Sequence, residues 1–284
     1  MPRGLFCQIW PEVIEYMTMQ WRWIILMTII LACNLGRSLG QNSITISMRS
    51  GLQEQITTDQ LLNYYTYRKE SSIPVLLDGL YSRGKNIFAL SAFYQSSRLL
   101  PDHLEQTSYT YNYLRHWETT IRFDYFHKLI DHDFLTVAAG ISTSSNMVTQ
   151  EQHYKSLLLN GAEGFRKSYD IAISSLSPSL LISFNFKKSN LWIKGYYTLA
   201  HLAARPDDGY VKQIGLKNSL QWKWYSPREY RNNFLCIGFR HLFGQSIGMI
   251  AEYEVAYRSY TGRDKYRYLR HSCLAGIFKT FNMK

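Results

Sequence analysis

The chain has 284 residues, enough for one large domain or two small ones. Apolar residues make up 46% of it and charged residues 19%, which excludes a disordered polymer and a helical membrane bundle. The net charge of +11 comes from basic residues scattered along the chain, so we do not expect nucleic-acid binding. The 22 Tyr residues, with 7 Trp and 14 Phe, suit a boundary between hydrocarbon and water.

The first 40 residues are predicted to be a signal peptide with an extended lead-in. Arg22 precedes an apolar core at Trp23–Cys33, which is shorter than the roughly 20 residues that a membrane-spanning helix needs. Small residues before position 41 then predict cleavage between Gly40 and Gln41. We therefore expect an exported protein whose mature part is residues 41–284.

Two alternatives remain open at this end of the chain. The acidic lead-in is unusual for a signal peptide, so translation could start at Met17 or Met19. Cys33 could instead be the lipidated residue of a lipoprotein signal, although Leu31 is a poor match two positions before it.

Beyond Gln41 the dominant pattern is period-two alternation of apolar and polar residues, which is typical of β-strands with two different faces. Its stretches reach or exceed the roughly ten residues that a tilted strand needs to cross a bilayer. The strands that we expect are Ile44–Ser50, Ile73–Ser82, Asn86–Ser97, Tyr109–Leu129, Phe134–Met147, Tyr169–Phe186, Leu191–Ala203, Val211–Tyr225, Asn233–Phe243 and Tyr266–Phe281.

The segment Tyr109–Leu129 has an aromatic face and an ionisable face. Four charges of alternating sign lie on the ionisable face, at Glu118, Arg122, Asp124 and Lys128. Paired charges of this kind can fill the lumen of a narrow barrel, whereas a solvated sheet face would show the same pattern. At about 3.3 Å per residue the segment is longer than a bilayer is thick, so it either projects from the membrane or bends.

The segment Val211–Tyr225 alternates most regularly. Its apolar face ends in Trp222 and Trp224, which we expect at the membrane interface, and its other face carries Lys217 and Lys223, which we expect in the lumen. A tight turn is predicted directly after it, at Ser226-Pro227-Arg228.

Short turns alternate with longer linkers along the chain. The linkers are expected at 51–72, 99–108, 148–168, 204–210 and 244–264. Outer-membrane barrels show this alternation because short periplasmic turns face longer extracellular loops. We therefore predict an all-β, up-and-down antiparallel transmembrane barrel of about ten strands, with Ile247–Tyr260 in a tall ninth strand or its loop. If that segment forms an extra hairpin, the count is twelve.

The chain closes on a strand whose aromatic Phe281 is typical of the segment that outer-membrane assembly machinery recognises. This terminal strand resembles an outer-membrane β-barrel family of Bacteroides-like bacteria. The Gln41 cleavage site, the Tyr-rich strands and the stretch Tyr197–Pro206 share the resemblance. The resemblance covers most of residues 41–281. It implies the fold and an outer-membrane location, and no activity.

The catalytic and metal-binding patterns of known enzymes do not occur in the sequence, so we do not expect an enzyme. No His-x-Ser pair occurs, although barrel lipases of the phospholipase type place those residues two apart on one strand. The turn at Asp131–Asp133 has the residue types of a protease site but reads as a plain turn. The eight His are dispersed, no CxxC occurs, and no cofactor motif is present, so neither a metal nor a cofactor is predicted.

These patterns predict an outer-membrane protein with a structural, binding or accessory role in the envelope and a filled lumen. The expected partners are outer-membrane lipid and lipopolysaccharide, the assembly machinery, and an envelope protein that would contact the loop at 148–168. Two alternatives stay open: a narrow channel for small solutes, and a lipid-modifying enzyme.

Overall fold

The computed structural model describes residues 42–59, 66–69, 73–101, 110–156, 163–204, 222–261 and 265–283. These residues belong to one compact unit, Gln41–Lys284, and form thirteen strands of one sheet. In this part of the chain no helix is long and apolar enough to cross a membrane. The predicted signal peptide, with its cleavage site at Gly40 and Gln41, lies outside the described residues and stays a prediction.

The strands are β1 (Asn42–Asp59), β2 (Thr66–Lys69), β3 (Val75–Arg83), β4 (Asn86–Pro101), β5 (Thr110–Asp131), β6 (Leu135–Ser156), β7 (Glu163–Phe186), β8 (Ser189–Tyr196), β9 (Ala200–Ala204), β10 (Trp222–Tyr225), β11 (Tyr230–Leu242), β12 (Ile247–Tyr260) and β13 (Tyr266–Met283).

Ten of these strands pair in a ring. From β1 the antiparallel pairings run through β3, β4, β5, β6, β7, β8, β11, β12 and β13, and the pairing of β13 with β1 returns to the start. Almost every step of this ring joins strands that are consecutive in the sequence, as in an up-and-down barrel. The predicted fold class and the count of about ten strands are confirmed.

The other three strands lengthen members of the ring. β2 pairs with β1 beyond the end of β3, β9 pairs with β7 beyond the end of β8, and β10 pairs with β9. The short irregular stretches 73–74, 197–199 and 226–229 therefore interrupt long strands instead of reversing the chain. Such interruptions increase the local twist, which lets long strands coil around a barrel.

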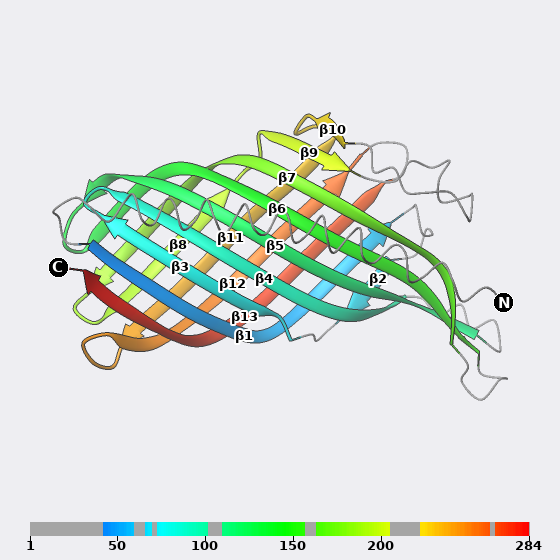
Figure 1. Ribbon diagram of the computed structural model, residues 1–284, viewed down its shortest axis with the longest axis horizontal. Coiled ribbons are helices and arrows are strands. Elements are labelled where there is room, and N and C mark those ends of the chain that lie inside the picture. The colour runs from blue at the N-terminus through cyan, green and yellow to red at the C-terminus, as the bar shows by residue number, and fades with distance from the viewer. Residues whose placement is uncertain are drawn as a thin grey trace. The chain divides into compact units, whose positions relative to one another are not determined.

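The described turns of two to four residues lie at one end of the barrel, which we call the turn end (Figure 1). They are Gly84–Lys85, 132–134, 187–188 and 243–246. The start of β1 at Asn42 and the end of β13 at Met283 lie at the same end of the barrel. The opposite end, which we call the loop end, receives the other ends of the long strands. β5, β6 and β7 have 22, 22 and 24 residues, so they extend well past the roughly ten residues that span a bilayer.

Two strand predictions are wrong, and they compensate each other in the count. Ser226–Arg228 does not separate two barrel strands, because β10 on one side of it continues into β11 on the other. Ile247–Tyr260 is instead a complete strand, β12, paired along its whole length with β11 and β13. The turn before it, Phe243–Ser246, has no Pro or Asn, and its single Gly is a weak turn signal.

The predicted linkers are also too long. The segment 148–168 consists largely of β6 and β7, which pair from Lys155 and Glu163 downward, so it is not a free loop. Residues 51–59 likewise belong to β1. These stretches are rich in Gln, Glu, Lys and Thr, which mask a strand because both of its faces can be polar outside a membrane.

The outer face carries an apolar band next to the turn end. Its exposed side chains come from every wall of the barrel, for example Ile46, Phe123, Ile141, Ile237 and Ile277. On β11 the band runs from His241 to Arg231, and ten residues of a strand tilted by about 40° cover about 25 Å. That height equals the hydrocarbon-facing band of outer-membrane barrels.

Candidate functional site

The interior of the barrel is filled by a network of charged side chains. Ten of them form its ion pairs, five acidic and five basic: Asp78, Glu118, Asp124, Glu252, Glu254, Arg49, Arg122, Lys194, Arg258 and Arg270. Their formal charges cancel, so the network does not favour the passage of ions of either sign.

Glu118 on β5 is the centre of the largest group. One carboxylate oxygen accepts hydrogen bonds from the Gln95 amide at 2.8 Å and the Tyr268 hydroxyl at 2.5 Å. The other oxygen pairs with Arg258 of β12 and, at 3.5 Å, with Arg270 of β13. Because Glu118 is fully buried, these partners replace the water that a carboxylate would otherwise keep.

Arg270 links this group to β12 and the far wall, because its guanidinium also lies 3.4 Å from Glu254. On that wall Arg49 of β1 pairs with Glu252 and, at 3.3 Å, with Asp78 of β3. Asp124 of β5 forms a third group with Arg122 and Lys194, each at 3.4 Å. Long charged side chains therefore connect opposite walls across the lumen.

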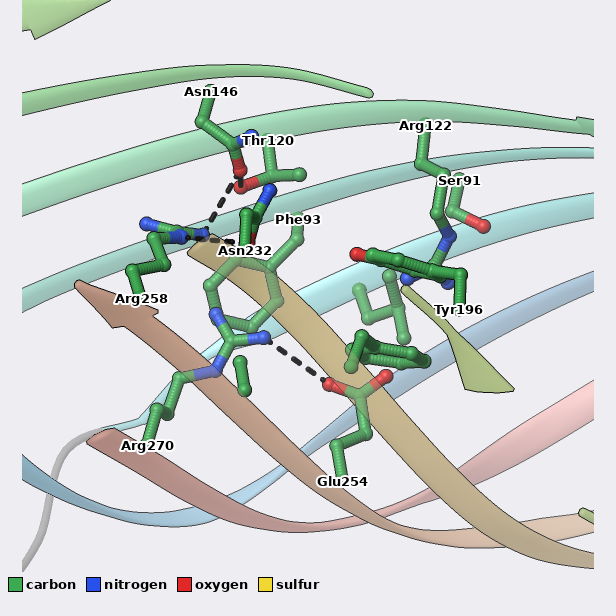
Figure 2. A pocket seen from close by; sticks show the side chains of 13 residues that line it. Ser91, Phe93, Thr120, Arg122, Asn146, Tyr196, Asn232, Glu254, Arg258 and Arg270 are labelled. Atoms are coloured by element: carbon green, nitrogen blue, oxygen red, sulfur yellow. Dashed lines mark hydrogen bonds and ion pairs between the residues drawn. The ribbon is translucent and has the colours of Figure 1, made fainter. Parts of the chain in front are cut away.

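A small cavity lies at the middle of this network (Figure 2). Residues from eight strands line it, and in Figure 2 the Arg270–Glu254 pair crosses beside Phe93 while Arg122 stacks near Tyr196. It has about 20 Å³ of space for the centres of water molecules, which is room for one or two waters. At this level the lumen has no room for a solute.

Toward the loop end the lumen is closed by apolar side chains. Eight buried residues from seven strands form this cluster, which we call the apolar layer: Tyr67, Leu99, Leu114, Val148, Ile171, Ile173, Ala203 and Tyr230. Tyr225 and Tyr260 pack against it. These side chains occlude the lumen above the charge network, and the few polar groups among them bond to one another, as the Gln152 amide does to the Tyr67 hydroxyl.

The predicted lumen charges fall in different places. Glu118, Arg122 and Asp124 are buried inside the barrel. Lys128 is half-buried at the turn end, 3.1 Å from Asp131. Lys223 is exposed on β10, on the same face as Tyr225 and so toward the mouth at the loop end, and Lys217 lies outside the described residues.

The predicted interfacial aromatics lie on the outer face at opposite ends. Trp222 and Trp224 are 41% and 73% exposed on β10, at the loop end, and Phe281 is 43% exposed on β13, at the turn end. Trp222 and Trp224 lie above the apolar band, because β10 extends the line of β11 beyond Arg231 toward the loop end.

Sequence reasoning missed seven of the ten network residues: Arg49, Asp78, Lys194, Glu252, Glu254, Arg258 and Arg270. A signal was present for three of them. Glu252, Glu254 and Arg258 occupy even positions of β12, whereas the odd positions from Ile247 to Tyr257 are apolar or aromatic, which is the alternation of a barrel strand. This alternation points to the lumen only when Ile247–Tyr260 is one complete strand.

One Ser–His hydrogen bond lies inside the barrel. The Ser175 hydroxyl is 3.1 Å from His201 Nδ1, and the Asn232 amide donates to the same hydroxyl at 3.3 Å. Nucleophilic catalysis uses such pairs, but a substrate must reach the hydroxyl. Ser175 is 6% exposed, and His201 is fully buried against the ring of Tyr230, so this group serves the packing of the wall.

Cys236, Glu252 and Glu254 bring three atoms of metal-ligand type within 4.8 Å of one another. Their surroundings do not fit a cation, because both carboxylates already pair with guanidinium groups, those of Arg49 and Arg270. A metal ion would have to displace both arginines into a lumen without free space.

No protein-family model matches the chain, and no curated protein sequence matches it. Solved structures of similar fold include the outer membrane protease OmpT from Escherichia coli, with 10% identity, a TM-score of 0.46, and coverage of 87% of this chain and 100% of that one. Ail, the attachment invasion locus protein of Yersinia pestis, has 9% identity, a TM-score of 0.31 and coverage of 86% and 100%. The Pseudomonas putida toluene transporter TodX has 9% identity, a TM-score of 0.32 and coverage of 88% and 91%.

None of these similarities identifies the Bacteroides-like family.

Proposed function

We propose that the protein is an outer-membrane barrel that acts through its loop-end surface, as a binding or accessory component of the envelope, and not as a pore. The apolar outer band next to the short turns supports the membrane location, since its height of about 25 Å matches a tilted ten-residue span. The long strands beyond the band raise the loop end well above the membrane surface.

The filled lumen carries this proposal. A channel needs a continuous passage lined by groups that an ion or solute can exchange for its hydration shell. Here the charge network leaves room for one or two waters, and the side chains of the apolar layer fill the lumen above it. Barrels of eight to ten strands are generally filled by their own side chains, and this interior follows that rule.

The proposed partners follow from the same geometry. The assembly machinery would recognise the terminal strand β13 with Phe281 near its end, and an envelope protein would contact the loop-end strands that include residues 148–168. Membership of the Bacteroides-like family belongs to this proposal too, on the strength of the Tyr-rich strands and the Tyr197–Pro206 stretch.

The test is planar-bilayer conductance of the purified, folded residues 41–284. We expect no stepwise channels above the background of empty bilayers and of heat-denatured protein, because the charge network and the apolar layer act in series. Steady single-channel conductance in the folded sample alone would contradict the proposal and favour a narrow channel for small solutes.

A further inference from the structure

Arginine side chains gather on the outer face at the upper margin of the apolar band. They are Arg231 on β11, Arg267 on β13, Arg68 on β2, Arg98 on β4 and Arg115 on β5. Each occupies an outward position, because the residues next to it in the strand, such as Tyr230 and Asn232 or Tyr266 and Tyr268, are buried inside. We call these five residues the arginine arc.

The arc is continuous across neighbouring strands. The pairings run from β11 through β12, β13, β1, β2 and β4 to β5, so the five arginines span seven adjacent strands. The described acidic side chains near this level are Glu54, Glu151 and Glu229, and Arg98 and Arg115 lie over the ring of Tyr113.

The arc marks a sharp boundary on the outer face. Between it and Lys279 near the turn end, the described outward positions of β11, β12 and β13 carry no Asp, Glu, Lys or Arg. A charged row directly above an uncharged band lies where the headgroups of a membrane leaflet begin. At the loop end of an outer-membrane barrel this is the outer leaflet.

The clearest site lies between Arg231 and Arg267. Both arginines are exposed, and both pair in register with Ser259, so their Cα atoms lie about 10 Å apart on either side of it. Arg267 also faces Thr58 on β1. Two exposed guanidinium groups therefore flank the buried Ser259 on one patch of wall, and guanidinium groups bind phosphate through two parallel hydrogen bonds.

We propose that Arg231 and Arg267 bind a phosphate group of the outer-leaflet glycolipid, lipopolysaccharide. The proposal deepens the proposed function and rests on its outer-membrane location. The partner is a phosphorylated lipid and not an acidic protein, because the arc follows the margin of the apolar band around the barrel, as a ring of lipid does.

The test compares two forms of one lipid on the purified, folded chain. Native mass spectrometry measures the binding of lipid A that carries both phosphates and of lipid A whose phosphates have been removed. We expect the phosphorylated lipid to bind at least about tenfold more tightly, since each basic side chain near an anionic surface strengthens attachment severalfold.

Two variants with equal loss of charge locate the site. The double variant R231Q/R267Q is expected to lower the affinity for phosphorylated lipid A about tenfold or more and to leave the affinity for the dephosphorylated lipid unchanged. The matched control is K85Q/K279Q, which removes two exposed charges from the turn end and is expected to change the affinity less than about twofold.

Equal binding of the two lipids by the parent chain would overturn the proposal and would favour an acidic protein as the partner of the arc. Equal losses in the two double variants would also overturn it, because they would show attraction by net charge alone. Failure here is distinguishable from failure of the proposed function, since lipid binding and bilayer conductance are measured separately on folded protein, identified by its heat-modifiable gel mobility.

Discussion

Glu118 shows how a single residue holds the barrel walls together. Its carboxylate is fully buried and contacts Arg258 of β12 and Arg270 of β13, which lie far from it in the sequence. A buried ion pair adds little by itself compared with apolar packing, but the removal of one partner leaves the others charged and unpaired in the interior. The network therefore specifies which strands face each other across the lumen.

We expect Glu118→Gln to lower the free energy of unfolding by about 3–5 kcal/mol, because it leaves the two arginines without their shared carboxylate. The measurement is guanidinium unfolding followed by heat-modifiable gel mobility and tryptophan fluorescence.

The matched control for this prediction is Glu54→Gln, which changes an exposed outward residue of β1 and should alter stability by no more than about 0.5 kcal/mol. Equal stabilities of the two variants would show that the Glu118 network does not support the fold.

At the scale of strands, the close pairing of β5 and β6 depends on a glycine. A Cβ atom placed at Gly140 would lie 1.7 Å from the carbonyl oxygen of Tyr125, so any side chain there forces the two backbones apart. Gly51 and Gly276 stand in the same relation to the backbones of β13 and β1. Glycines of this kind allow the sharp coiling by which a twisted sheet closes on itself.

Gly140→Ala is expected to destabilise the barrel by about 1–3 kcal/mol, through the backbone shift that relieves this contact. Gly244→Ala, in the turn before β12, is the control because its added Cβ has no atom within 4 Å. The comparison uses the same unfolding measurement, and a loss in the control as large as in the Gly140 variant would argue against the close approach as the cause.

For the whole molecule, the arrangement of the two ends predicts its orientation in the membrane. The turn end is compact and borders the apolar band, whereas the loop end is raised on long strands. Outer-membrane barrels place short turns in the periplasm and long extensions outside the cell. Thr261 should therefore be at the cell surface and Lys85 in the periplasm.

This orientation can be read by cysteine labelling of whole cells. In a Cys273→Ser background, which removes the exposed native thiol, Thr261→Cys should react with a membrane-impermeant maleimide on intact cells. Lys85→Cys should react only after the outer membrane is permeabilised. Both positions are exposed. The reverse pattern would invert the assignment of the two ends and move the arginine arc to the inner leaflet.

Several features of this protein were predictable from its sequence. Period-two alternation predicts strands wherever one face meets lipid and the other meets a polar interior, as at Asn86–Ser97, where β4 lies. Charges of alternating sign at Glu118, Arg122 and Asp124 indicate a polar inner face for the same reason. Such patterns are local, so one stretch of sequence is enough to reveal them.

Other features depend on which strands become neighbours. Arg258 and Arg270 meet Glu118 across 140 and 152 positions of sequence, and no local pattern pairs them. The continuity of β10 with β11 was hidden because Pro227 and its neighbours form a turn signal, while pairing with β9 and β8 keeps the strand direction. The arginine arc likewise exists only in the closed barrel, because the pairings bring its residues onto neighbouring strands. Local patterning thus determined the strands and their faces, whereas the pairings between distant strands decided what fills the lumen and what faces the membrane margin.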